Sequence, residues 1–206
     1  MHLPTIVFLA PAALCVLSWI GVGLALPERL LSGEPLLDWL TRIGFGSLVV
    51  SLALLALGRT GAFDRRLLVA LTAVCAVVGC ASLPGIGQHV RVGLGVGRGG
   101  GILRVLIGAV AVALVLDLVA ATAPPTSADA LKYHLALPKL WLQLGTVGDP
   151  FWRWEGFNPS AIDLLYAQGL AIGGGSAAGV LHAVFAVLCA LVLFGLGREP
   201  TLPSTG

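Results

Sequence analysis

Apolar residues in this chain occur in long runs that are separated by short polar or glycine-containing links. A helix needs about 20 apolar residues to cross a hydrocarbon core of roughly 30 Å. The runs therefore predict an all-α, polytopic membrane protein with about six apolar helices. These helices are expected at residues 4–26, 43–58, 67–86, 102–123, 161–172 and 177–196.

The same pattern divides the chain into four parts. Residues 1–123 hold the N-terminal transmembrane helices, and residues 124–160 form a loop of mixed composition. A transmembrane hairpin covers residues 161–198, and a polar tail covers residues 199–206. Gly173, Gly174 and Gly175 are expected to form the turn of the hairpin.

Composition supports this class. Of 206 residues, 57% are hydrophobic and 11% are charged, whereas a soluble domain has roughly twice that charged fraction. The net charge of +2 is too small to indicate a nucleic-acid partner. The first apolar run lacks a basic leading segment, so it is expected to stay as a membrane anchor. The cysteines lie inside apolar runs and are expected to be small buried hydrophobes: Cys15, Cys75, Cys80 and Cys189.

Chemistry is expected in the stretch 124–166, because charged, aromatic, proline and apolar residues mix only there over a long segment. Pro124 and Pro125 end the preceding helix. Between residues 127 and 144, polar or small residues recur at helical spacing opposite leucines. This pattern predicts amphipathic helices on the membrane surface, with a kink at Pro138. The polar stripe consists of Asp129, Lys132, Ala136, Lys139 and Gln143.

Two features of this region, and one in the helix before it, have alternative interpretations. Asp129 lies on the first turn of the expected surface helix, where it either complements the helix dipole or acts as a general base or metal ligand. Trp154, in an aromatic cluster with Phe151 and Trp152, either anchors the interface or stacks on a sugar or headgroup. Asp117, inside the fourth apolar run, either snorkels to the interface or faces protein or water.

The sequences ADALKYHLALPKLWLQLG, FNPSAIDLLYAQGLAI and AAGVLHAVFAVLCALVLFGLGR resemble the polytopic GT-C-type membrane glycosyltransferases. These include family 39 and the dolichyl-phosphate-mannose-like sugar transferases. In such enzymes an acidic residue stands in the first extracytoplasmic loop, and surface helices follow it. The resemblance covers roughly residues 115–198. It matches Asp129 to the loop carboxylate, Tyr133 and His134 to the positions just downstream, Pro159, Asp163 and Tyr166 to the start of the next helix, and His182 to a position in the helix after that.

The resemblance implies transfer of a sugar from a polyprenyl-phosphate-linked donor to an acceptor hydroxyl at the extracytoplasmic face. The protein would be a multi-pass protein of the cell (inner) membrane. Asp129 would be the catalytic base. No metal ligand is assigned, although a divalent metal cofactor stays an open alternative. The residues expected to bind substrate are Tyr133, His134, Lys132, Trp154 and Asp163; Lys132 and Lys139 either stabilise the leaving phosphate or snorkel toward headgroups.

Glycosyltransferases of this type have many more membrane helices, so the chain is expected to be an N-terminal part of one. The alternative is a non-catalytic multipass protein or a truncated, inactive fragment. A transporter is a weaker alternative, because no internal repeat is found in the sequence. Lys and Arg are spread almost evenly over the loops, so the positive-inside rule does not decide the orientation.

Overall fold

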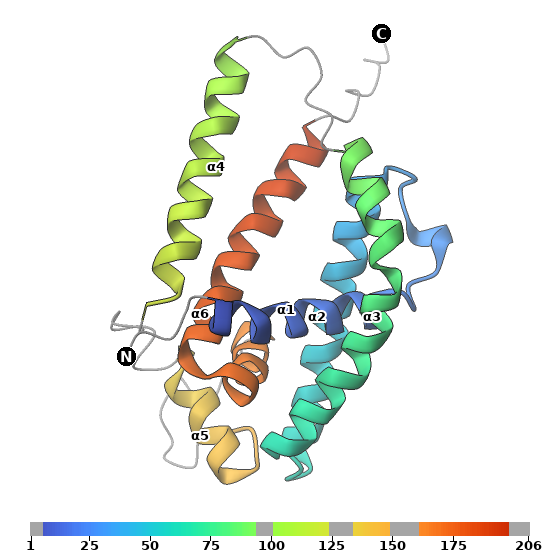
Figure 1. Ribbon diagram of the computed structural model, residues 1–206. Coiled ribbons are helices and arrows are strands. Elements are labelled where there is room, and N and C mark those ends of the chain that lie inside the picture. Colours follow the sequence, from blue (N-terminus) through green and yellow to red (C-terminus); the bar gives the residue numbers. More distant parts are fainter. Residues whose placement is uncertain (1–5, 94–100, 124–133, 149–160, 198–206) are drawn as a thin grey trace, which may run out of the picture.

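The computed structural model describes residues 6–93, 101–123, 134–148 and 161–197, and every regular element in these ranges is a helix (Figure 1). The prediction of an all-helical protein is therefore confirmed for this part of the chain. The elements are α1 (Ile6–Gly23), the short 3-10 helix η1 (Glu28–Leu30), α2 (Pro35–Arg59), α3 (Arg65–Gly93), α4 (Gly101–Ala121), α5 (Ala136–Leu144) and α6 (Ala161–Leu196).

Three described helices are long and apolar enough to cross a membrane: Pro35–Arg59, Arg65–Leu83 and Ala161–Leu196. The apolar stretches of α1 and α4 are shorter. Valines on the outer faces of α3 and α4 are widely exposed, with Val77 at 70% and Val105 at 71%. A large exposed apolar surface of this kind needs lipid or protein around it rather than water. The chain is a membrane protein.

The second long helix begins at Pro35, earlier than the expected start at residue 43. Proline at the first helical position loses no helical hydrogen bond, because that N–H has no partner inside a helix. Asp38 in the first turn complements the positive end of the helix dipole. Trp39, expected in a link, therefore lies inside α2, where the guanidinium carbon of Arg42 is 6.0 Å from its ring centroid.

Helix α1 packs against α2, α3 and α6, and glycines allow its backbone to approach its neighbours closely. A methyl group at Gly21 would collide with the carbonyl oxygen of Cys75, and one at Gly79 with the carbonyl oxygen of Leu17. Gly46 of α2 lies against the α1 backbone in the same way. Small residues at such contacts are typical of membrane helices, where van der Waals packing holds helices together.

A buried amide connects α1, α3 and α6. Gln168 is 2% exposed. Its side-chain oxygen accepts a hydrogen bond of 2.9 Å from the indole nitrogen of Trp19. Its nitrogen donates to the hydroxyls of Ser18 and Thr72 at 3.0 and 2.9 Å. Each hydroxyl donates in turn to a backbone carbonyl of its own helix. The network saturates the polar atoms of this amide in an otherwise apolar interior.

Helix α6 is broken at Gly174, within the glycine triplet that was expected to form a turn. The backbone there has φ 76° and ψ −165°, a conformation that glycine adopts without a steric penalty. The two halves of α6, residues 161–173 and 175–196, fold back on each other. Consequently Gly169 in the first half lies against Ala178 and Leu181 in the second.

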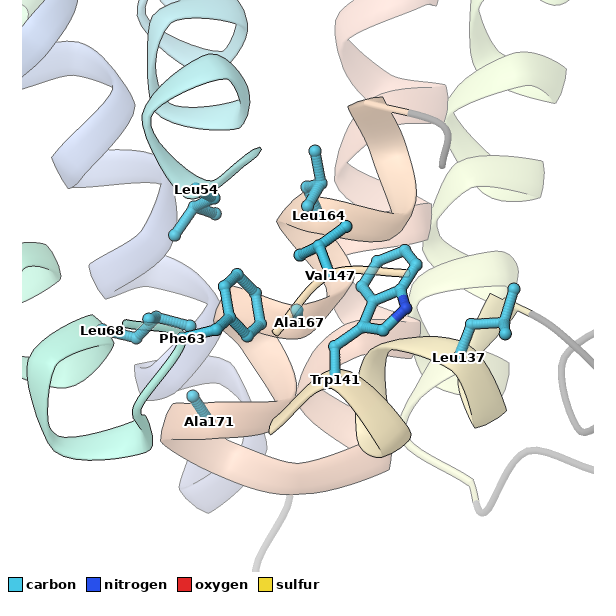
Figure 2. Close-up of a cluster of buried hydrophobic side chains, with 9 residues drawn as sticks. All are labelled: Leu54, Phe63, Leu68, Leu137, Trp141, Val147, Leu164, Ala167 and Ala171. Atoms are coloured by element: carbon cyan, nitrogen blue, oxygen red, sulfur yellow. The ribbon is translucent and has the colours of Figure 1, made fainter. Parts of the chain in front are cut away.

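The described surface-helix region contains α5, which begins at Ala136. Pro138 lies in the first turn of α5, where it breaks no hydrogen bond of that helix, and the part of the expected surface helix before residue 134 lies outside the described residues. The apolar side of α5 packs on protein, with Trp141 fully buried. Figure 2 shows this cluster, in which α5 covers the first half of α6 and the α2–α3 turn. Its buried members are Leu54, Phe63, Leu68, Leu137, Trp141, Val147, Leu164, Ala167 and Ala171.

All four cysteines are free thiols. Cys15 is buried, as expected, and Cys75 is intermediate. Cys80 and Cys189 are exposed, so the expectation of burial is wrong for them. Both lie on long apolar helices, where a thiol behaves as a small hydrophobe in contact with lipid.

Adding one methyl group at two different glycines should change stability in opposite directions. Gly79→Ala places a Cβ atom against the Leu17 carbonyl and forces α1 and α3 apart, so we expect the free energy of unfolding to fall by about 1–3 kcal/mol. Gly108→Ala, in α4, meets nothing within 4 Å and should be neutral or stabilising by up to about 1 kcal/mol. Thermal unfolding in lipid nanodiscs measures both. Equal shifts for the two variants would show that the α1–α3 contact is not close.

Replacing the buried amide should also destabilise the fold. Gln168→Leu leaves the Trp19 indole N–H without an acceptor in an apolar interior, at a cost of about 1–3 kcal/mol. The hydroxyls of Ser18 and Thr72 keep their carbonyl acceptors, so the loss centres on Trp19. Gln143→Leu on the exposed side of α5 is the matched control. Chemical denaturation followed by tryptophan fluorescence measures the difference, and equal stability of the two variants would contradict the role given to Gln168.

Candidate functional site

The structure describes two of the site residues predicted from the sequence, His134 and Asp163, and it brings them together. The two residues are 29 positions apart in the sequence. The other four residues expected to catalyse or to bind substrate lie outside the part of the chain that is described, so the assignment of Asp129 as a base stays a prediction. These residues are Asp129, Lys132, Tyr133 and Trp154.

His134 and Asp163 form a short polar contact. The Nδ1 atom of His134 lies 2.7 Å from Oδ1 of Asp163. Asp163 stands in the first turn of α6 with 6% of its side chain exposed, whereas the His134 side chain, just before α5, is 39% exposed. A carboxylate that accepts a hydrogen bond from Nδ1–H orients the imidazole and places the basic lone pair of the neutral ring on Nε2. The pair can therefore bind a hydroxyl or exchange a proton with one.

Tyr166 and His182 form a second polar contact beside the first. The phenolic oxygen of Tyr166 is 2.6 Å from Nδ1 of His182. Tyr166 is buried in the first half of α6, and His182 is exposed on the second half. The fold-back at Gly174 is what brings these two side chains together, because they lie on opposite sides of the break.

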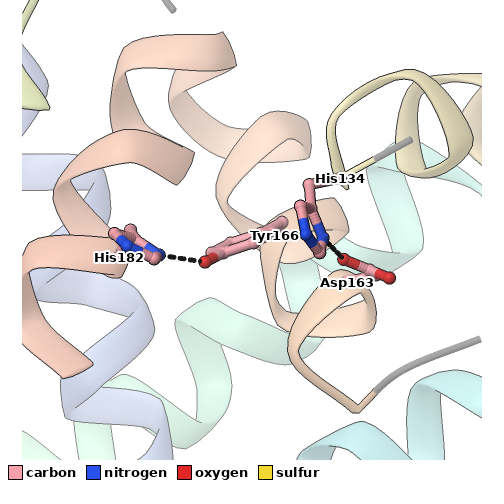
Figure 3. Close-up of polar contacts among 4 residues, drawn as sticks. All are labelled: His134, Asp163, Tyr166 and His182. Atoms are coloured by element: carbon pink, nitrogen blue, oxygen red, sulfur yellow. Dashed lines mark hydrogen bonds and ion pairs between the residues drawn. The ribbon is translucent and has the colours of Figure 1, made fainter. Parts of the chain in front are cut away.

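The four side chains form a row, His182–Tyr166–His134–Asp163 (Figure 3). In its middle, the rings of His134 and Tyr166 meet edge to face, with centroids 6.3 Å apart and an interplanar angle of 87°. That contact is aromatic rather than a hydrogen bond. The row therefore consists of two polar pairs joined by one ring contact.

Part of this row was visible in the sequence. Asp163 and Tyr166 are three residues apart, so they share a face of any helix that contains them. The resemblance also matched Tyr166 and His182 to family positions. What the sequence did not indicate is that the two residues contact each other, because that contact depends on the direction in which α6 turns at Gly174.

The row lies inside the helix bundle rather than at its end. The Ser51 hydroxyl donates a hydrogen bond of 3.1 Å to the carbonyl of Ala161, the first residue of α6. At a rise of 1.5 Å per residue, Ser51 lies about 12 Å along α2 from its last residue, Arg59. Asp163 follows Ala161 by less than one turn. The His134–Asp163 pair is thus set back from the end of the bundle at which α2 ends and α5 packs.

No group of three or more His, Cys, Asp or Glu side chains that could hold a metal ion occurs among the described residues. His134 and Asp163 supply one imidazole and one carboxylate, both of which are groups that bind metal ions in proteins. Asp117, the carboxylate expected to face protein, water or the interface, lies on the exposed side of α4 and does not join the row. The described chain therefore offers a polar binding pair but no preformed metal centre of its own.

Comparison of the chain with protein-family models, with curated proteins and with solved structures finds no match. The functional argument therefore rests on the residues and their geometry.

Proposed function

We propose that this chain is a membrane glycosyltransferase, or the N-terminal part of one. It would transfer a sugar from a polyprenyl-phosphate-linked donor to an acceptor hydroxyl at the extracytoplasmic face. One observation carries the proposal. His134, which ends the D-x-x-x-Y-H run of the family resemblance, is held by the buried carboxylate of Asp163, a second residue of that resemblance.

The roles follow from this pairing. Asp129 acts as the base that removes the acceptor proton while the hydroxyl attacks the anomeric carbon from the face opposite the phosphate. His134, oriented by Asp163, binds a polar group of the substrate beside that base. Lys132 and Tyr133 lie between these two positions in the sequence, and Trp154 provides an aromatic face for the sugar. A basic side chain near the phosphate stabilises the charge that develops as the phosphate leaves.

The proposal also includes a membrane arrangement that goes beyond the three long apolar helices. It has about six apolar helices in a multi-pass protein of the cell (inner) membrane, with the loop of residues 124–160 extracytoplasmic and its helices at the interface. The break at Gly174, which divides α6 in two, and the apolar character of α1 and α4 support this count. The contact between the Gly145 carbonyl and the Phe63 N–H supports placing the end of α5 on the same side as the α2–α3 turn.

The alternative is a non-catalytic multipass protein, and one observation favours it. Among the described residues, every buried side-chain nitrogen or oxygen has a hydrogen-bond partner. A set of polar groups that satisfy one another also serves to hold helices together in lipid. If the chain is an enzyme, removing a carboxylate of the site lowers turnover. If it is a non-catalytic protein, the same change alters only stability.

Two carboxylate substitutions separate the proposed roles in a transfer assay. Membranes that contain the complete gene product are given a polyprenyl-phosphate-linked sugar and an acceptor. Asp129→Asn should lower kcat by a factor of roughly 10²–10⁴, as expected for loss of a general base. Asp163→Asn weakens the hold on His134, so it should raise KM on the order of tenfold with a smaller change in kcat.

Asp117→Asn is the matched control for both variants, because this carboxylate is exposed on α4 and away from the row. It should retain wild-type kcat and KM. Wild-type turnover by well-expressed Asp129→Asn and Asp163→Asn would exclude both carboxylates from a reaction and leave the structural alternative.

The orientation is tested by cysteine labelling. Gln143 is exposed on α5, so Gln143→Cys should react with a membrane-impermeant maleimide in intact cells. Gly148, which follows α5, is less suitable than Gln143 for the cysteine, because its φ of 151° would strain any residue with a side chain. Arg29→Cys, in the exposed η1 that precedes α2, should react only after lysis because α2 separates the two positions. The parent chain gives the background from its own cysteines. The reverse pattern would place the 124–160 loop in the cytoplasm.

A further inference from the structure

A groove with two cationic side chains opens at the end of the bundle where α2 ends and α3 begins. It measures about 700 Å³, within the range of small-molecule sites. Arg65 from α3 and Lys139 from α5 contribute the charges, and the α6 turn closes one side. The remaining lining residues are mostly apolar: Leu135, Ala136, Leu142, Gln143, Leu170, Gly174 and Gly175.

The two cations are placed differently. The Nε atom of Arg65 donates a hydrogen bond of 2.8 Å to the carbonyl of Ala171, which holds the guanidinium beside the α6 turn. Within the described ranges, no residue takes a hydrogen bond from its terminal amino groups or from the ammonium of Lys139. Both side chains are exposed, so their charges are available to a ligand in the groove.

Among the described residues, this end of the molecule carries more positive than negative charge. Arg59, at the end of α2, and Arg66, in the first turn of α3, are exposed. None of the described residues that line the groove is a carboxylate. Asp64, in the same turn, accepts hydrogen bonds from the backbone N–H groups of Arg66 and Leu67, so its carboxylate is held at the positive end of the α3 dipole. The groove therefore complements an anion.

A second groove, of about 940 Å³, differs from the first in its balance of charge. It is lined by the segment between α1 and α2 and contains Glu28 and Asp38 beside Arg42. The Nη1 atom of Arg42 donates to the backbone carbonyls of Leu24 and Leu26, at 3.4 and 3.2 Å. Its cation is thus matched by nearby acidic and carbonyl groups, and this groove has no excess positive charge.

We propose that the groove between Arg65 and Lys139 binds the phosphate of an anionic phospholipid from the surrounding bilayer. Arg65 stands at the start of the apolar helix α3, where lipid headgroups lie, and Lys139 lines the same groove from α5. The leucine walls suit the start of an acyl chain. A juxtamembrane Lys or Arg contributes about 1 kcal/mol to attraction for anionic lipid, which corresponds to roughly fivefold in affinity. This proposal is independent of the sugar transfer proposed above.

The test titrates the purified full chain in detergent with phosphatidylglycerol and with phosphatidylcholine, and native mass spectrometry counts bound lipid. Phosphatidylglycerol should bind more tightly. Lys139→Gln should weaken that binding about fivefold, and the double variant with Arg65→Gln about 25-fold. Arg29→Gln, at an exposed position of η1, is the matched control and should change nothing. Equal binding of the two lipids would overturn the proposal.

Lys139→Gln decides the outcome even where the double variant unfolds, because the side chain of Lys139 makes no hydrogen bond to another described residue. Unchanged phosphatidylglycerol binding by this variant would overturn the proposal. Two competitors identify other occupants. Displacement of phosphatidylglycerol by stoichiometric polyprenyl phosphate would make the groove a donor site, and displacement by millimolar inorganic phosphate would make it a soluble-anion site. Either result would overturn the assignment to a bilayer phospholipid.

Discussion

The hydrogen bonds of the Gln168 side chain are the constraint on which the arrangement of α1, α3 and α6 depends. Lipid tails are as apolar as leucine, so burying leucines between helices gives little preference for one arrangement over another. A buried amide differs because each unsatisfied polar atom is costly in an apolar interior. Ser18 and Thr72 donate their protons to backbone carbonyls, so their hydroxyls offer lone pairs to Gln168. The carbonyl oxygen of the amide is then directed at Trp19, and the direction of every bond is determined.

This network fixes the first half of α6, and the candidate site belongs to the same half-helix. Asp163 and Tyr166 precede Gln168 by less than two turns and are buried with it. Once Gln168 is tied to α1 and α3, the face that carries Asp163 and Tyr166 is directed toward His134 and His182. The glycine break completes the arrangement, because the second half of α6 must return alongside the first to bring His182 to Tyr166. A binding pair is therefore positioned by packing that lies outside the pair itself.

The apolar runs predicted the all-helical class and the long apolar helices, because hydrophobic length is a property of the sequence alone. The glycine triplet likewise marked the break in α6, since few other residues adopt its backbone conformation. The early start of α2 was not predicted, because Pro35 and the charged residues after it resemble a link. Contacts across the fold were also beyond the sequence. His134 and Asp163 meet only because α5 packs on α6, and the burial of Trp141 shows that α5 uses its apolar face for protein.

The two ends of the first half of α6 have different environments, and this difference connects the groove to the site. Asp163 begins the half-helix inside the bundle, whereas Ala171 near its end accepts the hydrogen bond from Arg65. Eight residues of helix separate them, or about 12 Å. An anion that binds Arg65 and Lys139 would neutralise two neighbouring cations and stabilise the contact between α3 and the α6 turn. Because Asp163 and Ala171 belong to one continuous stretch of helix, an anion that stabilises the outer end would also restrain the inner end that carries Asp163.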